Sequence, residues 1–248
     1  MKQLTITLPE LPYAVEEAMN RLRINIKFCG KNTRKILLTS CLPNEGKSTV
    51  SSYLWKMLAE AGFPTVLVDA DLRKSVMRKR LQIEYKEDVR GLNHYLSGMA
   101  EYDEVVYQTN VANGYLVPCT QLLESPSALL EDSRFRDLLN TLAENYRFVI
   151  IDTPPLGSVS DSALIASMCD GAVLVIRAGV TPKGMIKQSL FELEQVNCKL
   201  LGTVLNRVEV HSRAYGKYYS KYYGKYGKKY GYGYGYSYGY GDTHKRHK

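Results

Sequence analysis

A ten-residue loop, "SCLPNEGKST" at 40–49, constrains the fold more than any other stretch of this chain. It follows a short apolar run, "KILLTS", and precedes a helical pattern, "STVSSYLWKMLAEAG", that Gly62 closes. The next apolar run, "TVLVDAD", completes a strand, loop, helix and strand, which is a βαβ unit with parallel strands. The loop therefore lies where a strand becomes a helix, at one edge of a parallel sheet.

The alternation of apolar runs and amphipathic helices continues to about residue 210. Helical patterns are "YAVEEAMNRLRINIKF", in which Val15, Met19, Leu22 and Ile26 share one face, then "SPSALLEDSRFRDLLNTLAENY", "DSALIASMC" and "GMIKQSLFELEQVN". Apolar runs are "RFVIIDTPP", "GAVLVIRAG" and "KLLGTVLNRV". The less regular segment 74–118 predicts a helix near "GLNHYLSG" and a short strand at "GYLVP". This pattern predicts an α/β fold, with a mostly parallel sheet and helices on both faces.

The loop at 40–49 has the chemistry of a phosphate-binding loop, or P-loop. Backbone N–H groups and a helix N-terminus favour an anion there, while a lysine and a hydroxyl complete a nucleotide cradle. Lys47 is expected to reach the β and γ phosphates, and Ser48 to ligate Mg²⁺. The pattern G-x-x-x-x-G-K-[ST] is met from Gly46 onward, but Cys41 stands where the first glycine would be. An ordinary turn is the alternative for the loop taken alone.

Three aspartates end two of the apolar runs: Asp69 and Asp71 in "VLVDADLRK", and Asp152 in "FVIIDTPP". Ligands of open α/β sheets gather at the carboxyl ends of the strands. Phosphoryl transfer needs carboxylates to hold Mg²⁺, and a carboxylate can also accept the proton of an attacking hydroxyl. Each aspartate could instead cap a following helix. Three of them together with a P-loop favour the catalytic interpretation.

The composition changes sharply after residue 210. From 211 to 248 there are nine Lys/Arg and one acid, so this tail carries the whole net charge of +8, and residues 1–210 are balanced. Twelve tyrosines lie within residues 215–241, interleaved with glycine and lysine. Such a composition predicts a disordered tail. We therefore divide the chain into a folded domain at 1–210 and a flexible basic tail at 211–248.

The remaining composition bears on the compartment. The five cysteines are scattered without a CxxC pair, which favours a reducing compartment. The N-terminal stretch contains acids and prolines rather than the apolar run of a signal peptide, and no segment approaches the ~18 apolar residues of a membrane span. A cytoplasmic protein is expected, whose membrane contact comes through a partner or the basic tail.

The motifs together resemble those of the bacterial tyrosine kinases that govern capsule and exopolysaccharide synthesis. "PNEGKST", "VLVDADLRK" and "FVIIDTPP" look like the Walker A, Walker A′ and Walker B motifs of that family. "EEAMNRLRINIKF" is similar to its N-terminal helix, "GLNHYLSG" and "ESPSALLEDSRFRDLL" to its middle segments, and "GTVLNRV" to its last core strand. The resemblance implies a P-loop fold and an ATP- and Mg²⁺-dependent protein-tyrosine kinase that regulates polysaccharide synthesis and export.

The resemblance also implies roles for individual residues. Catalysis is expected from Lys47, Asp69, Asp71 and Asp152, with either Asp69 or Asp71 as the base. Metal binding is expected from Ser48, Asp71 and Asp152. ATP is expected to contact Asn44, Glu45, Gly46, Lys47, Ser48 and Thr49, with Arg177 and Asn206 lining the nucleotide site. The phosphoacceptors would be the tail tyrosines of a second copy: Tyr215, Tyr218, Tyr219, Tyr222, Tyr223, Tyr226, Tyr230, Tyr232, Tyr234, Tyr236, Tyr238 and Tyr240.

Partners follow from the same family. Its Glu-x-x-Arg-x-x-Arg pattern on the first helix supports ring-shaped homo-oligomers; here Glu17 and Arg23 match, Asn20 takes the middle position, and Arg21 is the substitute. A separate transmembrane adaptor resembling a chain-length regulator would activate the kinase and recruit it to the inner face of the plasma membrane. A phosphotyrosine phosphatase would be the counter-enzyme, and no specific nucleic acid is expected.

Two other functions compete with this interpretation. A ParA/MinD-type partitioning ATPase shares the fold, the P-loop and the aspartates, but usually has a further lysine early in the P-loop, where this chain has Ser, Cys, Leu and Pro at 40–43. A tail that binds nucleic acid or another polyanion could combine basic and aromatic residues. Neither alternative explains the P-loop and the tyrosine cluster together.

Overall fold

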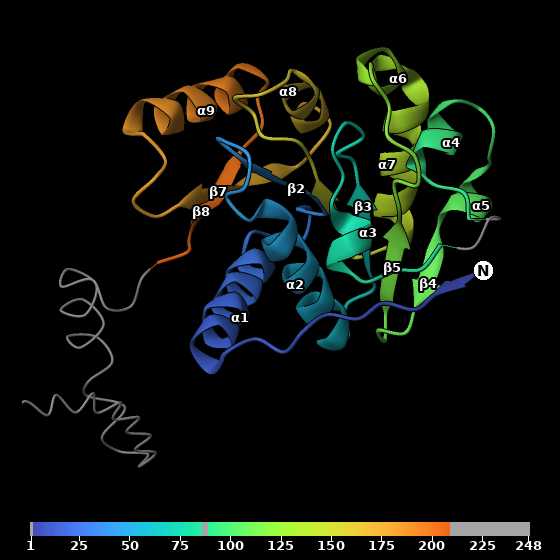
Figure 1. Cartoon of the computed structure of the whole chain (residues 1–248), viewed down its shortest axis with the longest axis horizontal. Coiled ribbons are helices and arrows are strands. Elements are labelled where there is room, and N and C mark those ends of the chain that lie inside the picture. The colour runs from blue at the N-terminus through green and yellow to red at the C-terminus, as the bar shows by residue number, and fades with distance from the viewer. Residues whose placement is uncertain (1, 86–88, 209–248) are drawn as a thin grey trace, which may run out of the picture. The chain divides into compact units, whose positions relative to one another are not determined.

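The described part of the chain is built around one eight-stranded sheet. The computed structural model describes residues 2–85 and 89–208 (Figure 1). The strands are β1 (Gln3–Leu4), β2 (Lys35–Ser40), β3 (Thr65–Asp69), β4 (Tyr107–Thr109), β5 (Gly114–Val117), β6 (Phe148–Asp152), β7 (Gly171–Arg177) and β8 (Leu200–Asn206). They lie in the order β1-β4-β5-β3-β6-β2-β7-β8, and each neighbouring pair is parallel except β4 with β5. The predicted mostly parallel sheet is confirmed.

Helices cover both faces of this sheet (Figure 1). They are α1 (Tyr13–Phe28), α2 (Lys47–Glu60), α3 (Met77–Arg80), α4 (Leu92–Leu96), α5 (Tyr102–Val105), α6 (Ser127–Glu131), α7 (Ser133–Asn145), α8 (Asp161–Ala166) and α9 (Lys183–Gln195). The first three pack on one face, and α4 to α9 pack on the other. Each strand must therefore be apolar on both sides, which is why the strands are continuous apolar runs.

The alternation of side chains along the strands divides the core into two layers. In β2, Ile36 and Leu38 point to the layer under α1 and α2, while Leu37 points to the layer under the later helices. All three are fully buried. The same alternation holds in β6, where Ile150 and Ile151 belong to opposite layers.

The register of the strands brings polar side chains to one edge. Asp69 at the end of β3 pairs with Asp152 at the end of β6, and Leu38 of β2 pairs with the same Asp152. Parallel strands end at the same edge, so the loops after β2, β3 and β6 meet there. The fold thereby assembles the P-loop and the aspartate-bearing loops from three separate parts of the chain.

Some local features differ from the sequence predictions. Val15 is 45% exposed, although the spacing placed it on the buried face of the first helix; Met19 and Ile26 are the buried members of that face. The strands β1 and β4 were not predicted, because they are two and three residues long and exist by pairing with each other and with β5. Within the described residues, no helix is both long and apolar enough to cross a membrane.

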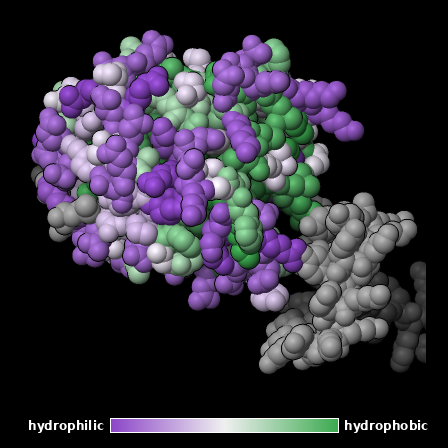
Figure 2. Space-filling model, turned by 180° about the vertical axis from the view of Figure 1, so that it is seen from behind, coloured by the Kyte–Doolittle hydropathy of each residue, from purple (hydrophilic) through white to green (hydrophobic). Residues whose placement is uncertain are grey.

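Apolar side chains also reach the surface on one side of the molecule. Figure 2 shows a band of hydrophobic residues at its right-hand side, where α1, α9 and β8 lie once the view of Figure 1 is turned. The exposed apolar residues of these elements include Phe28, Phe191 and Leu205. β8 is also the last strand of the sheet, so that one of its edges has no neighbouring strand among the described residues.

Candidate active site

The P-loop connects β2 to α2 and is shaped around one glycine. Gly46, which precedes the first helical residue Lys47, has φ +97°, a conformation that L side chains rarely adopt. A Cβ at this position would also collide with the side-chain amide of Asn206. The N–H groups at the start of α2 therefore face the loop, with the positive end of the helix behind them.

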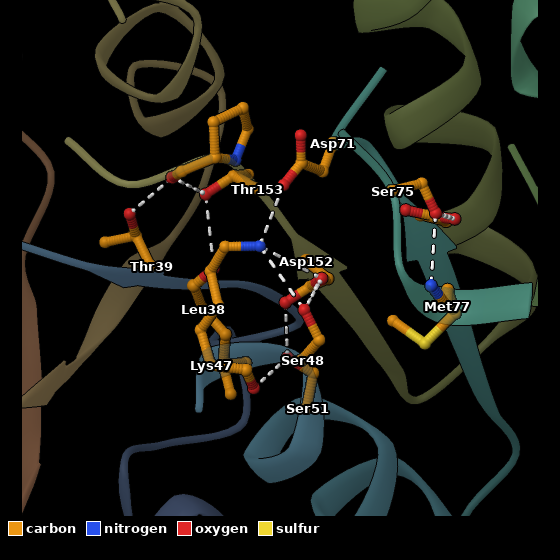
Figure 3. A network of polar contacts seen from close by, with 12 residues as sticks. Leu38, Thr39, Lys47, Ser48, Ser51, Asp71, Ser75, Met77, Asp152 and Thr153 are labelled. Atoms are coloured by element: carbon orange, nitrogen blue, oxygen red, sulfur yellow. Dashed lines mark hydrogen bonds and ion pairs between the residues drawn. The ribbon is translucent and has the colours of Figure 1, made fainter. Parts of the chain in front are cut away.

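The amine of Lys47 lies between two carboxylates (Figure 3). Its Nζ is 3.0 Å from Oδ2 of Asp71 and 3.4 Å from Oδ2 of Asp152. All three side chains are nearly buried. Burial alone would lower the pKa of Lys47, but the charges of Asp152 and Asp71 outweigh it and raise this pKa. Lys47 is therefore a buried cation that holds the carboxylates of two loops together.

Asp152 is fixed by two hydroxyl groups from α2. Ser48 donates to its Oδ2 at 2.7 Å, and Ser51 donates to its Oδ1 at 2.7 Å. Both carboxylate oxygens are thus oriented by the helix that begins at the P-loop. Hydrogen bonds of this length that are accepted by a charged group are among the stronger ones in proteins.

Asp69 lies deeper and has a different environment. It is fully buried, and its Oδ2 accepts a 2.5 Å hydrogen bond from Ser75, while its Oδ1 accepts none within the described residues. Burial raises the pKa of Asp69 to about 8, although the hydrogen bond from Ser75 lowers it. The charges of Asp152 and Asp71 also raise this pKa. The three aspartates therefore share one site but differ in how they are paired.

The other residues expected around a nucleotide flank the P-loop. The carboxylate of Glu45 accepts hydrogen bonds from the N–H of Leu42, at 2.9 Å, and from the hydroxyl of Thr181. Its carbonyl accepts one from Nδ2 of Asn206, at 2.8 Å. The N–H of Arg177 donates to Thr181 at 3.1 Å. The carboxyl ends of β7 and β8 are thereby attached to the P-loop.

Asn44 and Thr49 occupy the two sides of the P-loop turn. Asn44 is exposed with φ +63°, and the N–H of Thr49 donates to the carbonyl of Gly46 in the first turn of α2. The structure thus brings the predicted P-loop, aspartate and strand-end residues together at one edge of the sheet.

Two groups of predicted residues lie elsewhere. Glu17, Arg21 and Arg23 are on α1, where Arg21 is exposed and the other two are half-buried. The tyrosines at 215–240 lie outside the described residues.

Four residues of the site were not predicted from the sequence: Ser51, Ser75, Thr181 and Arg73. Ser51 follows Lys47 by four positions and so lies on the same face of α2, a signal that helical spacing could have provided. Thr181 and Arg73 bond residues 136 and 88 positions away, and Ser75 bonds Asp69 six positions earlier, outside any helix or strand period. No spacing in the sequence indicates these contacts.

The donor set fits a nucleotide with a magnesium ion. Ser48, Asp71 and Asp152 offer hard oxygen ligands within one cluster, and Asp69 retains a buried oxygen without a hydrogen bond. No group of three or more His, Cys, Asp or Glu suited to a metal occurs in the described part of the chain. Magnesium in nucleotide sites characteristically takes one or two carboxylates and completes its shell with phosphate and water, so this set is sufficient.

Comparison with known proteins identifies the group to which this site belongs. A family model described as an AAA domain matches residues 30–197. The tyrosine-protein kinase CpsD of Streptococcus agalactiae is 40% identical over 201 residues, which cover 81% of this chain and 87% of that protein. The tyrosine-protein kinase etk of Escherichia coli K12 is 31% identical over 194 residues, or 77% of this chain and 26% of that longer protein.

Solved structures agree with this grouping. The kinase domain of the Escherichia coli tyrosine kinase ETK superimposes with a TM-score of 0.74 at 29% identity, covering 91% of this chain and 80% of that one. The septum site-determining protein MinD of Pyrococcus horikoshii, solved with Mg-ADP, has a TM-score of 0.63 at 24% identity over 73% of this chain and 72% of that one, which shows the shared fold. The 40% identical kinase relative and the family model over residues 30–197 agree with the P-loop and its neighbouring aspartates, and so the chain belongs to the bacterial tyrosine kinases of capsule and exopolysaccharide synthesis and is a nucleotide-binding protein-tyrosine kinase.

Proposed function

We propose that this kinase transfers the γ-phosphoryl group of ATP to the tyrosine cluster at 215–240 of a second copy of the chain, and thereby regulates capsular or exopolysaccharide synthesis and export. The observation that carries the proposal is the convergence of Lys47, Asp71 and Asp152 at the P-loop edge of the sheet. The tyrosine-rich composition of the tail supplies the acceptor. We likewise propose the division into a kinase domain at 1–210 and a tail at 211–248.

The site supports a division of labour among the charged groups. Lys47, together with the N–H groups of the P-loop and the start of α2, would bind the phosphates and neutralise charge that develops on them. Arg177 and Asn206 would line the nucleotide site beyond the P-loop. Either Asp69 or Asp71 would accept the proton of the tyrosine hydroxyl, since a phenol of pKa about 10 is almost fully protonated at neutral pH.

The metal would be held by Ser48, Asp71 and Asp152. When bound, Mg²⁺ would supply positive charge next to the β and γ phosphates. One oxygen of Asp71 and one of Asp152 lie within 3.4 Å of the same Lys47 amine, so both carboxylates belong to one cluster. Ser51 and Ser48 orient Asp152 for this purpose.

A phosphotyrosine map by mass spectrometry tests the reaction. The wild type, Lys47→Ala and a chain truncated after Val210 are incubated with Mg·ATP, with and without the cytoplasmic peptide of the candidate adaptor. We expect phosphate on the tail tyrosines of the wild type and none on Lys47→Ala. ATP hydrolysis with an unmodified tail, even with the peptide present, would favour a partitioning-type ATPase, whose fold this chain shares.

Mixing two variants tests whether the transfer occurs between copies. Full-length Lys47→Ala offers the tail without an active P-loop, and the truncated chain offers the active site without a tail. We expect phosphate on the Lys47→Ala tail when both are present with Mg·ATP, and none when either is alone. A wild-type tail that is labelled at a rate independent of protein concentration, with no labelling in the mixture, would instead indicate transfer within one chain.

We also propose a homo-oligomer that uses the surface of α1 around Glu17, Arg21 and Arg23. The exposed apolar residues of α1, such as Phe28, support an interface on this side. Light scattering of the wild type against Arg21→Glu and Phe28→Asp tests it, and equal masses would contradict it. A separate transmembrane adaptor that recruits the kinase to the membrane and a phosphotyrosine phosphatase complete the proposed set of partners.

A polyanion-binding tail remains the competing function from another class. It predicts a salt-sensitive RNA mobility shift that Lys47→Ala retains and truncation after Val210 abolishes. The kinase function predicts no such specific nucleic-acid binding.

A further inference from the structure

We propose that Arg73 is a positioning residue for magnesium-dependent nucleotide binding, because its guanidinium ties the loop that carries Asp71 to the helix that follows the loop of Asp152. The inference rests on the proposed magnesium site. It assigns a function to a contact that lies outside the P-loop and joins residues 88 positions apart.

The contact is a two-pronged ion pair. Nε of Arg73 lies 2.6 Å from Oδ2 of Asp161, and its Nη2 lies 3.1 Å from Oδ1 of the same carboxylate. The planar guanidinium matches a carboxylate in this geometry and fixes both distance and orientation, which a lysine amine cannot do.

The remaining donors of Arg73 extend the connection to a third segment. Nη1 donates to the carbonyl of Glu124 at 2.9 Å, and Nη2 lies 3.0 Å from the hydroxyl of Ser127. Ser127 in turn donates to Oδ1 of Asp161 at 2.8 Å. Three segments of the chain thus meet at one guanidinium, and both oxygens of Asp161 are satisfied.

Burial makes this connection stiff. Asp161 is 1% exposed, so its charge is stable only with a close, hydrogen-bonded partner. The backbone adds a second attachment nearby, because the N–H of Leu123 donates to the carbonyl of Leu72 at 2.8 Å. The loop after β3 is therefore held on its outer side by side-chain and backbone contacts.

The inner side of the same loop has a connection of a different kind. The side chains of Asp71 and Asp152 both contact the amine of Lys47 there, and the N–H of Ala70 donates to the carbonyl of Asp152 at 2.9 Å. When Lys47 contacts a phosphate, its amine interacts more weakly with Asp71 and Asp152. The two negatively charged carboxylates then repel each other in a buried site. The outer bridge between Arg73 and Asp161 does not depend on Lys47. It would keep the two carboxylate loops at the spacing that a shared metal ion requires.

The expected effect has a specific signature. Residues that orient metal ligands typically change metal affinity by 10- to 100-fold when they are altered. Loss of the bridge should therefore weaken the gain in nucleotide affinity that Mg²⁺ provides, and leave the affinity measured without Mg²⁺ nearly unchanged. A residue needed only for the stability of the fold would weaken both.

Equilibrium titration with a fluorescent N-methylanthraniloyl-ADP, with Mg²⁺ and with EDTA, measures both affinities. We compare the full-length wild type with Arg73→Gln, Arg73→Lys and Asp161→Asn. Arg134→Gln is the matched control, since Arg134 also binds a backbone carbonyl, that of Tyr95 at 3.0 Å, but lies on α7 away from the site. We expect the gain from Mg²⁺ to fall about tenfold or more in Arg73→Gln and Asp161→Asn, partly in Arg73→Lys, and not in Arg134→Gln.

The outcomes distinguish the positioning role of Arg73 from the proposed magnesium site. A wild-type gain from Mg²⁺ that a folded Arg73→Gln retains would overturn the positioning role and leave the proposed function intact. A wild type that gains nothing from Mg²⁺ would overturn the proposed magnesium site and this inference with it. If Arg73→Gln fails to fold, the nearly isosteric Asp161→Asn decides, and thermal unfolding of each variant shows which result to use.

Discussion

The Nζ atom of Lys47 lies 3.0 Å from Oδ2 of Asp71, and this ion pair is almost entirely buried. Two elements that are distant in sequence, the start of α2 and the loop after β3, are joined by it. Because burying a charge is costly unless it is paired, the pair makes the P-loop and the aspartate loops interdependent. The effect of removing one charge on stability should therefore depend on whether its partner is present.

Lys47→Ala should destabilise the protein as well as inactivate it. Removing one partner of a buried ion pair typically costs about 3–5 kcal/mol, because the other charge stays buried without compensation. Here Asp71 and Asp152 would both lose the amine. Urea unfolding measures the loss, and Lys47→Ala combined with Asp71→Asn should recover part of it. A double variant no more stable than Lys47→Ala would show that repulsion between the carboxylates is not the cause.

Gly46→Ala should destabilise the P-loop and weaken ADP binding. The substitution combines the strain of a positive φ, about 1–3 kcal/mol, with a collision against Asn206. Gly179→Ala is the control, since Gly179 has φ +71° but nothing within 4 Å of the added Cβ. Thermal unfolding should show a larger loss for Gly46→Ala, and ADP titration should show weaker binding for this variant alone. Equal losses of stability would mean that the collision with Asn206 contributes nothing.

Ser51→Ala should lower kinase activity about tenfold or more, although Ser51 lies one turn into α2 and not in the P-loop itself. Its hydroxyl orients Oδ1 of Asp152, a carboxylate that we assign to the metal. Ser52→Ala is the control, because Ser52 is equally buried on the same helix but donates to the carbonyl of Ser48 at 2.6 Å. The measurement is the initial rate of tail phosphorylation at saturating ATP and Mg²⁺. Similar rates for the two variants would argue against a role for Ser51 at Asp152.

The pair of Arg73 and Asp161 should stabilise the protein in a pH-dependent way. Burial alone would raise the pKa of Asp161, but hydrogen bonds from Arg73 and Ser127 outweigh it and hold this pKa below its usual range. A carboxyl with a depressed folded pKa stabilises the protein above its unfolded pKa of about 3.9, and this stability is lost as the pH falls through the folded pKa.

Urea unfolding between pH 3 and pH 6 tests this dependence. The difference in free energy of unfolding between the wild type and Asp161→Asn should be largest near pH 6 and should shrink below about pH 4. Asp137→Asn, on the exposed face of α7, should show little difference throughout. A difference between wild type and Asp161→Asn that is constant across this range would contradict the paired, ionised state of Asp161.

Much of the fold could be predicted because its elements are long and periodic. The apolar runs of β2, β3, β6 and β7 and the helical spacing of α2 and α7 are visible in the sequence, and alternation of such elements implies a parallel sheet. The short strands β1 and β4 could not be predicted, because their two and three residues carry no period of their own. Val15 shows the limit of helical spacing, which indicates a common face but not what covers it.

The sequence by itself determined which chemistry is available: a P-loop with Lys47 and Ser48, aspartates at the ends of two apolar strands, and a tyrosine-rich tail. Local rules suffice for these features, since each depends on residues close together in the chain. Tertiary structure alone decided that Asp71 and Asp152 share one amine, that Asp69 pairs in register with Asp152, and that Arg73 reaches Asp161. The physical reason is that strand register and loop packing set these distances, and both arise from contacts between segments far apart in the sequence.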